Sequence, residues 1–92
     1  MEWVKLNDKI KLRRREILFD DILVFDTIME EGGEFGKHLH PDCIEHVDVI
    51  KGELVDLIDN SVYNEGDKLV IMAGKYHIPV STEHTIIKVY FK

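Results

Sequence analysis

The 92-residue chain is long enough for one folded domain and too short for two independent hydrophobic cores, so we predict a single domain over residues 1–92. Hydrophobic residues make up 45% of the chain and charged residues 33%, which is typical of a folded globular protein and excludes a disordered one. The 18 acidic and 12 basic residues give a formal net charge of −6. Neither nucleic acid nor an anionic membrane is therefore expected as a partner, because phosphate groups bind to positively charged surfaces.

The predicted compartment is the cytoplasm. The apolar runs are each only a few residues long, far short of a membrane span. The first residues contain no basic head followed by an apolar run, so no signal peptide is expected. The single cysteine, Cys43, cannot form an intrachain disulfide. We expect Cys43 to be a small buried apolar residue in preference to a metal ligand or a redox group.

Short apolar runs and alternating patterns with many β-branched residues predict strands along the whole chain. Gly, Asn and Asp residues separate these strands and mark the turns. Many short strands with closely spaced turns favour an all-β sandwich or barrel over a fold of alternating strands and helices. The expected strands span about residues 2–6, 9–17, 21–30, 36–41, 45–51, 53–59, 68–72, 76–80 and 85–91.

Residues 9–16 form the only basic cluster of the sequence. In a strand, Lys9, Lys11, Arg13 and Arg15 share one face, and Ile10 and Leu12 lie on the other. We interpret this segment as a solvated outer strand whose charges protect a sheet edge from pairing with another chain. An anion-binding or partner-binding patch is the alternative, and the acidic character of the whole chain disfavours it.

All five histidines lie within residues 38–84, and the first two form the pattern His38-Leu39-His40. Residues two apart in a strand point to the same side, with Cα atoms about 6.6 Å apart. Two imidazoles on one side can reach a single metal ion, each over a bond of about 2.1 Å. The pattern is therefore compatible with a bidentate metal clamp, although it is a weak signal by itself.

The alternation in residues 45–52 favours Glu45 as a third ligand. Glu45, Val47 and Val49 share one face, and the two valines indicate that this face is the interior. An inward carboxylate is unfavourable unless it is paired, protonated or bound to a metal. His46 is then expected on the outer face. Asp42 competes as a carboxylate ligand, but Pro41 interrupts the strand, so a role in the turn or beside the ligands is preferred for it.

His77 follows the apolar run 69–72 and a turn at Gly74, and by itself it is typical of a structural, hydrogen-bonded histidine. A wider pattern adds to this interpretation. Residues 32–52 resemble the first motif of the cupin superfamily, G-x5-H-x-H-x4-E-x6-G, at every defining position. Residues 66–81 are similar to the second motif, G-x5-P-x-G-x2-H-x3-N, with Met72 in place of the proline and Ser81 in place of the asparagine.

This resemblance implies a double-stranded β-helix, the jelly-roll barrel of small single-domain cupins (the monocupin or cupin 2 type), with the metal site inside it. The 13 residues between the two motifs, 53–65, correspond to one hairpin. The resemblance also implies the ligand set: His38, His40 and Glu45 fall on the first-motif ligands and His77 on the second-motif ligand.

Three imidazoles and one carboxylate suit a divalent metal ion, with iron or manganese favoured and nickel, zinc, cobalt or copper also compatible. In an octahedral arrangement two positions stay open, so the ion can polarise a carbonyl group or bind a substrate beside dioxygen. We therefore expect a mononuclear metal enzyme (a dioxygenase, isomerase or lyase) that acts on a small organic molecule. A non-catalytic binding or sensing module and a purely structural metal are the alternatives.

Residues around the site are less well specified by the sequence. Phe25, Phe35, Met29 and Met72 are candidates for lining a cavity, although core packing explains them equally well. Tyr76 is expected at the rim and His84 in an exposed turn. A homodimer is also expected, with the segments around Trp3-Val4 and Ile86–Phe91 as candidate interface, unless these strands complete the core of the monomer itself.

Overall fold

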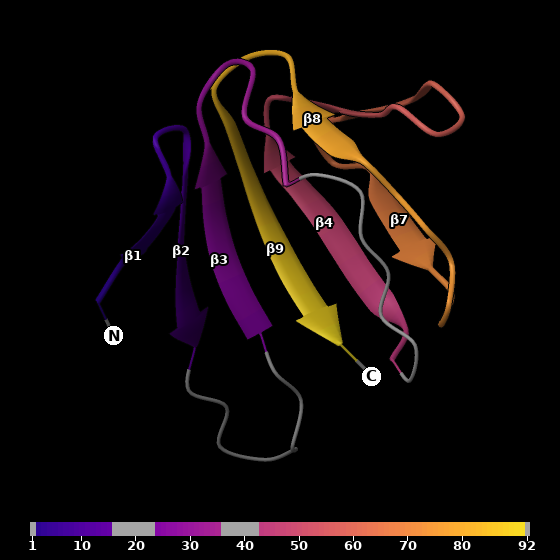
Figure 1. The fold of residues 1–92 in the computed structure, drawn as a ribbon, viewed down its shortest axis with the longest axis horizontal. Coiled ribbons are helices and arrows are strands. Elements are labelled where there is room, and N and C mark those ends of the chain that lie inside the picture. Colours follow the sequence, from indigo (N-terminus) through magenta and orange to yellow (C-terminus); the bar gives the residue numbers. More distant parts are fainter. Residues whose placement is uncertain (1, 16–23, 36–42, 92) are drawn as a thin grey trace.

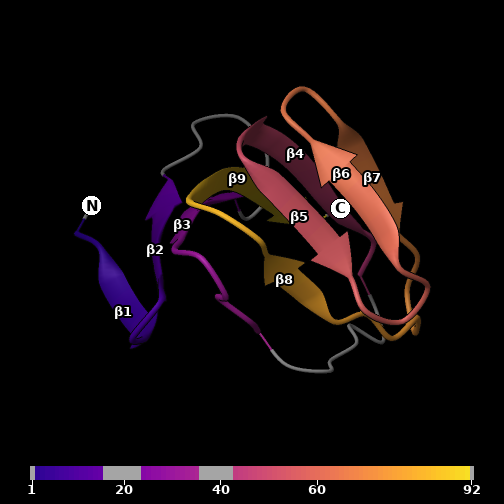
Figure 2. The same ribbon diagram turned by 90° about the horizontal axis from the view of Figure 1, so that it is seen from above.

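The computed structural model describes residues 2–15, 24–35 and 43–91, and all regular structure in these ranges is β-strand. The expected all-β fold class is confirmed. None of the described residues belongs to a helix that could cross a membrane. The strands, labelled in Figure 1 except for β5 and β6, which Figure 2 labels, are β1 (Val4–Asn7), β2 (Ile10–Arg15), β3 (Val24–Met29), β4 (Glu45–Lys51), β5 (Glu53–Asp56), β6 (Ser61–Asn64), β7 (Lys68–Ile71), β8 (Pro79–Ser81) and β9 (Thr85–Phe91).

The strands form two antiparallel sheets that face each other. The larger sheet has six strands in the order β1-β2-β3-β9-β4-β7, and the smaller has three in the order β6-β5-β8. Figure 2 shows the smaller sheet stacked against the part of the larger sheet that contains β9, β4 and β7. The buried apolar side chains fill the space between them, and they include Ile10, Met29, Val49, Leu54 and Ile87.

The observed strands follow the predicted ones, with local differences. The strand expected over 53–59 ends at Asp56, because the chain turns through residues 57–60 and returns as β6, a strand that the sequence analysis did not separate. This turn contains Asn60 at a φ of 61°, a left-handed conformation that asparagine tolerates. The single hairpin expected between the two motifs is therefore confirmed. The strand expected over 36–41 lies outside the described residues.

The basic strand β2 has the predicted parity, but its position in the sheet differs from the expectation. Ile10 is 2% exposed in the core. On the opposite face, the Lys11 ammonium and the Arg13 guanidinium lie 5.5 and 4.7 Å from the centre of the Trp3 ring. The expectation that β2 protects a sheet edge was wrong, because β1 pairs with it and is itself the edge strand. Arg13 also pairs with Asp26, at 3.1 Å between Nε and Oδ2.

Gly52 connects the two sheets, because it lies between β4 of the larger sheet and β5 of the smaller one. Its φ is +94°, and a Cβ atom placed on it would lie 2.5 Å from the His84 carbonyl oxygen and 2.7 Å from the Thr85 Cα. Backbone atoms cannot move to make room for a Cβ atom, whereas the end of a flexible side chain can. The last glycine of the first motif is therefore required both by its backbone conformation and by the close approach of the chain that leads into β9.

Replacing Gly52 with alanine should destabilise the fold strongly. Left-handed backbone costs about 1–2 kcal/mol for a non-glycine residue, and the steric overlap should add about 1–3 kcal/mol. Urea denaturation followed by circular dichroism would measure the loss. Gly66→Ala is the matched control, since Gly66 has a φ of +88° but open space around its Cβ position. Equal losses in the two variants would contradict the steric argument.

Ser81, which stands where the second motif has asparagine, fastens the turn after β3 to the end of β8. It is fully buried, and its hydroxyl donates to the Glu30 carbonyl oxygen at 2.7 Å and accepts from the Gly33 amide at 3.1 Å. The backbone adds two further bonds, from Gly32 N to Ser81 O and from Ser81 N to Gly33 O. The serine therefore supplies hydrogen bonds at the strand end where asparagine was expected.

Ser81→Ala should lower the free energy of unfolding by about 0.5–1.5 kcal/mol, because it removes the hydrogen bonds of the hydroxyl while the Gly33 amide still donates to the Glu30 carbonyl oxygen at 2.9 Å. Thr82→Ala is the control: the neighbouring hydroxyl donates to the Glu53 carboxylate in a solvent-exposed hydrogen bond of 2.8 Å, and its removal should cost less than about 0.5 kcal/mol. Thermal unfolding of both variants tests the difference, and a Ser81→Ala protein as stable as Thr82→Ala would refute the role of the buried hydroxyl.

Candidate metal and ligand site

Glu45 begins β4 and points into the interior between two apolar neighbours. Its cross-strand partners are Ile71 on β7 and Phe91 on β9, and the residue is 6% exposed. Burial along β4 alternates, with Glu45, Val47 and Val49 on the inner face. The parity argument for Glu45 is confirmed, because the adjacent His46 lies on the outer face and stacks on Tyr90, with ring centres 4.8 Å apart.

His77 lies in the segment between β7 and β8, which is fastened to the β5–β6 hairpin. The next residue, Ile78, donates its amide to Asp56 Oδ1 at 3.2 Å, and its carbonyl oxygen accepts from the Leu57 amide at 2.9 Å. The turn before it uses Gly74 at a φ of +77°. These backbone contacts hold the His77 side chain inside the molecule, where it is 2% exposed.

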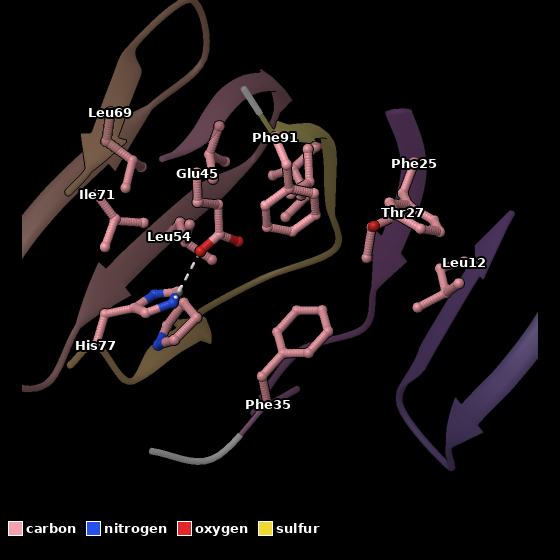
Figure 3. A pocket seen from close by; sticks show the side chains of 14 residues that line it. Leu12, Phe25, Thr27, Phe35, Glu45, Leu54, Leu69, Ile71, His77 and Phe91 are labelled. Carbon is pink, nitrogen blue, oxygen red and sulfur yellow. Dashed lines mark ion pairs between the residues drawn. The ribbon is translucent and has the colours of Figure 1, made fainter. Parts of the chain in front are cut away.

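The two side chains meet in the interior. Glu45 Oε2 and His77 Nε2 are 2.9 Å apart, as the dashed line in Figure 3 shows. A carboxylate and an imidazole are expensive to bury singly, and their contact offsets part of that desolvation cost. The structure thus brings together one predicted ligand from the first motif and the predicted ligand from the second motif.

The donor set of this pair fits a divalent metal ion. Imidazole nitrogen and carboxylate oxygen both bind first-row divalent ions at about 2.0–2.2 Å. Two donors at right angles on an ion with such bonds are about 3.0 Å apart. The observed separation of 2.9 Å is close to that value, so Glu45 and His77 can act as adjacent ligands of one ion.

The other predicted ligands, His38 and His40, lie outside the described residues, as does Asp42. Within residues 2–15, 24–35 and 43–91, no group of three or more His, Cys, Asp or Glu side chains is gathered around a common point. Cys43, which is described, is exposed and carries no disulfide. The expectation that it is buried was wrong, because it precedes β4 and does not take part in the inward alternation that begins at Glu45.

A cavity of about 280 Å³ adjoins the Glu45–His77 pair. Most of its described lining is aliphatic or aromatic, and includes Phe25, Phe35, Leu54, Leu69, Ile87 and Phe91. The predicted roles of Phe25 and Phe35 are therefore confirmed. Met29 belongs to the core, where it is fully buried, and Met72 is 58% exposed, so neither lines the cavity. Tyr76 is half exposed next to the buried His77.

The sequence analysis did not single out several lining residues. Phe91 and Val89 come from β9, and Leu12 and Thr27 come from β2 and β3. Alternation gave a signal for the β9 residues, because Ile87, Val89 and Phe91 share one face of a strand. No comparable signal marked Thr27, since a lone threonine in a strand is usual on either face.

No protein-family model matches the sequence, and a search of curated proteins finds no match. Solved structures are similar in fold. An RmlC-like cupin from Shewanella frigidimarina superposes with a TM-score of 0.84 over 98% of this chain and 81% of the other, at 18% identity. A chain in the complex of Rhodobacter sphaeroides SigE with the anti-sigma ChrR gives a TM-score of 0.86, over 99% of this chain and 49% of the other, at 16% identity.

A recombinant oxalate oxidase in complex with glycolate is also similar, with a TM-score of 0.62 and 26% identity. The match covers 76% of this chain and 41% of the oxalate oxidase chain, so this protein corresponds to less than half of that enzyme. Proteins with this architecture thus include an oxalate oxidase and a chain of a SigE–anti-sigma complex, and the likeness concerns the fold. The two facing antiparallel sheets and these neighbours together show that the chain has the cupin fold, a double-stranded β-helix of the jelly-roll type.

Proposed function

We propose that this protein is a small metal-binding cupin that holds one divalent ion through His38, His40, Glu45 and His77 and acts on a small organic molecule beside that ion. The observation that carries the proposal is the buried contact of 2.9 Å between Glu45 and His77 at the wall of the cavity. Iron or manganese is favoured as the metal, and nickel, zinc, cobalt and copper also suit the donor set.

The sequence around the pair supports the remaining ligands. His38 and His40 are two residues apart and precede Glu45 at the spacing of the first cupin motif. Glu45 occupies in the structure the inward position that this motif assigns to a ligand, and His77 is buried beside it. Four ligands from two distant segments would also stabilise a small domain, because metal binding favours the folded state over the unfolded one.

The cavity supports a role beyond structure for the metal. Structural metal sites are closed by protein ligands, whereas catalytic sites keep an open position. Here about 280 Å³ of space adjoins two of the proposed ligands, enough for a small molecule to reach them. A divalent ion bound there would act as a Lewis acid, and the chain would bind and orient the substrate and exclude water from it.

Removing a proposed ligand should remove the metal. The metal-free protein is titrated with Zn²⁺ by isothermal titration calorimetry, and one ion per chain is expected. Each ligand variant should weaken zinc binding by more than about 100-fold: His38→Ala, His40→Ala, Glu45→Gln and His77→Ala. Loss of a residue that only hydrogen-bonds to a ligand costs up to about 100-fold, and loss of the ligand itself should cost more. Circular dichroism checks that each variant is folded.

His46→Ala is the matched control for this titration. His46 follows Glu45 directly but faces outward and stacks on Tyr90, so its removal should leave zinc affinity within about threefold of the original. A large loss in His46→Ala, or unchanged affinity in Glu45→Gln and His77→Ala together, would overturn the proposed ligand set.

Anaerobic purification with elemental analysis would identify the native metal, and the protein loaded with it is then assayed for oxygen uptake and for turnover of small organic acids and carbonyl compounds. We expect turnover that disappears in His77→Ala. Saturable ligand binding without any turnover would instead favour the non-catalytic binding module. Unfolding on chelation, without ligand binding, would favour a structural metal.

We also propose that two copies of the chain associate through β1. This strand is the edge of the larger sheet, and its apolar residues Val4 and Leu6 are 60% and 52% exposed. The other candidate segment, β9, lies in the middle of the sheet and contributes Ile87 and Val89 to the core of the monomer. Sedimentation velocity should show a dimer that Leu6→Lys dissociates, and a monomer at high concentration would exclude it.

A further inference from the structure

The cavity next to the Glu45–His77 pair is divided into a polar end and an apolar remainder. Figure 3 shows Glu45 and His77 together on one side, Phe91 and Phe35 beyond them, and Leu12, Phe25 and Thr27 on the far side. Apart from the pair, Thr27 is the only polar residue in the described lining. A ligand that reaches the pair therefore places most of its body against carbon atoms.

The apolar part of the cavity is built from several strands and is held by packing. Phe25 on β3 and Phe91 on β9 meet edge to face, with ring centres 6.3 Å apart. Phe35 packs against the core cluster from the segment after β3. Large side chains that contact one another form a fixed wall, which favours a ligand with a compact apolar body over a flexible polar one.

The described lining also contains no lysine or arginine. Two cationic groups of β2 are directed away from it, since Lys11 and Arg13 lie over the Trp3 ring and Arg13 pairs with Asp26. Beyond the pair, a second carboxylate on a ligand or a ring of hydroxyl groups would find only the Thr27 hydroxyl as a partner among these side chains. Such a ligand would lose its hydration with little compensation.

From this division we infer that the site takes a small molecule with its polar atoms at one end, directed at Glu45, His77 and the metal, and a compact hydrocarbon body against the Phe25, Phe35 and Phe91 wall. Dicarboxylates and polyhydroxylated sugar acids bind more weakly, because the described side chains of the lining offer them few polar partners. The inference rests on the proposed function for the position of the head group, and it specifies the chemical class of the substrate.

The test compares two probes that share a six-membered ring and a single carboxylate, cyclohexanecarboxylate and glucuronate. Each is titrated into zinc-loaded protein labelled at the methyl groups of Ile, Leu and Val, and methyl NMR spectra report where it binds. The lining methyl groups of Leu54, Leu69 and Ile87 should shift with cyclohexanecarboxylate, and the exposed Val62 and Leu57 should not. Glucuronate should bind at least about tenfold more weakly, because its hydroxyl groups lose water in the apolar space.

Variants test the wall itself. Phe35→Ser should weaken binding of cyclohexanecarboxylate by about tenfold or more, whereas Leu57→Ser, which removes a side chain that is 48% exposed on the hairpin turn, should leave it unchanged. Glucuronate binding as tightly as cyclohexanecarboxylate, or cyclohexanecarboxylate shifting only exposed methyl groups, would overturn the inference.

Zinc stoichiometry is measured on the same samples, so that the two proposals fail separately. Protein that binds one zinc ion but prefers glucuronate contradicts the substrate class and leaves the metal site standing. Protein that binds no zinc contradicts the proposed function. In that case the preference between the two probes, measured by the same methyl shifts in metal-free protein, still decides whether the cavity selects an apolar body.

Discussion

The buried contact between Glu45 and His77 is the interaction on which the site depends. A carboxylate and an imidazole are each 6% or less exposed, in a space otherwise lined almost entirely by carbon. Neither group would be stable there alone, because burial of an unpartnered charge costs several kcal/mol. The architecture must therefore deliver both side chains to one point, and the rest of the fold can be understood as the means of doing so.

Two features of the chain bring the Glu45 and His77 side chains together. Glu45 is placed by strand alternation at the start of β4, between Ile71 and Phe91 on the neighbouring strands. His77 is placed by the hydrogen bonds of the next residue, Ile78, whose amide donates to the Asp56 carboxylate and whose carbonyl oxygen accepts from the Leu57 amide. The hairpin itself reaches the opposite sheet through Gly52, where the chain approaches Thr85 too closely for any side chain. Gly52 therefore helps to position His77, because it leads into the hairpin to which the His77 segment is bonded.

The distribution of polar and apolar residues in the cavity gives information about the ligand that the fold alone does not give. The neighbours in fold include an oxalate oxidase and a chain of a sigma–anti-sigma complex, so the barrel does not choose the ligand. The described wall does carry such information, because it presents aliphatic and aromatic carbon over most of its area and the polar Glu45–His77 pair at one end. In the functions proposed above, the metal ligands would supply the chemistry, and the phenylalanine wall would select the molecule.

The sequence by itself determined the features that depend on local periodicity. Alternation with a period of two identified the inward face of β4 and the buried face of β2, and the motif spacing predicted the jelly-roll fold. Only the tertiary structure decided which strands are neighbours, and hence that β1 pairs with β2 at the sheet edge. It also decided that Cys43 is exposed and that the Glu45 and His77 side chains are in contact. The physical reason is that side-chain direction is fixed within a few residues of chain, whereas pairing between strands and the lining of a cavity depend on contacts between residues far apart in sequence.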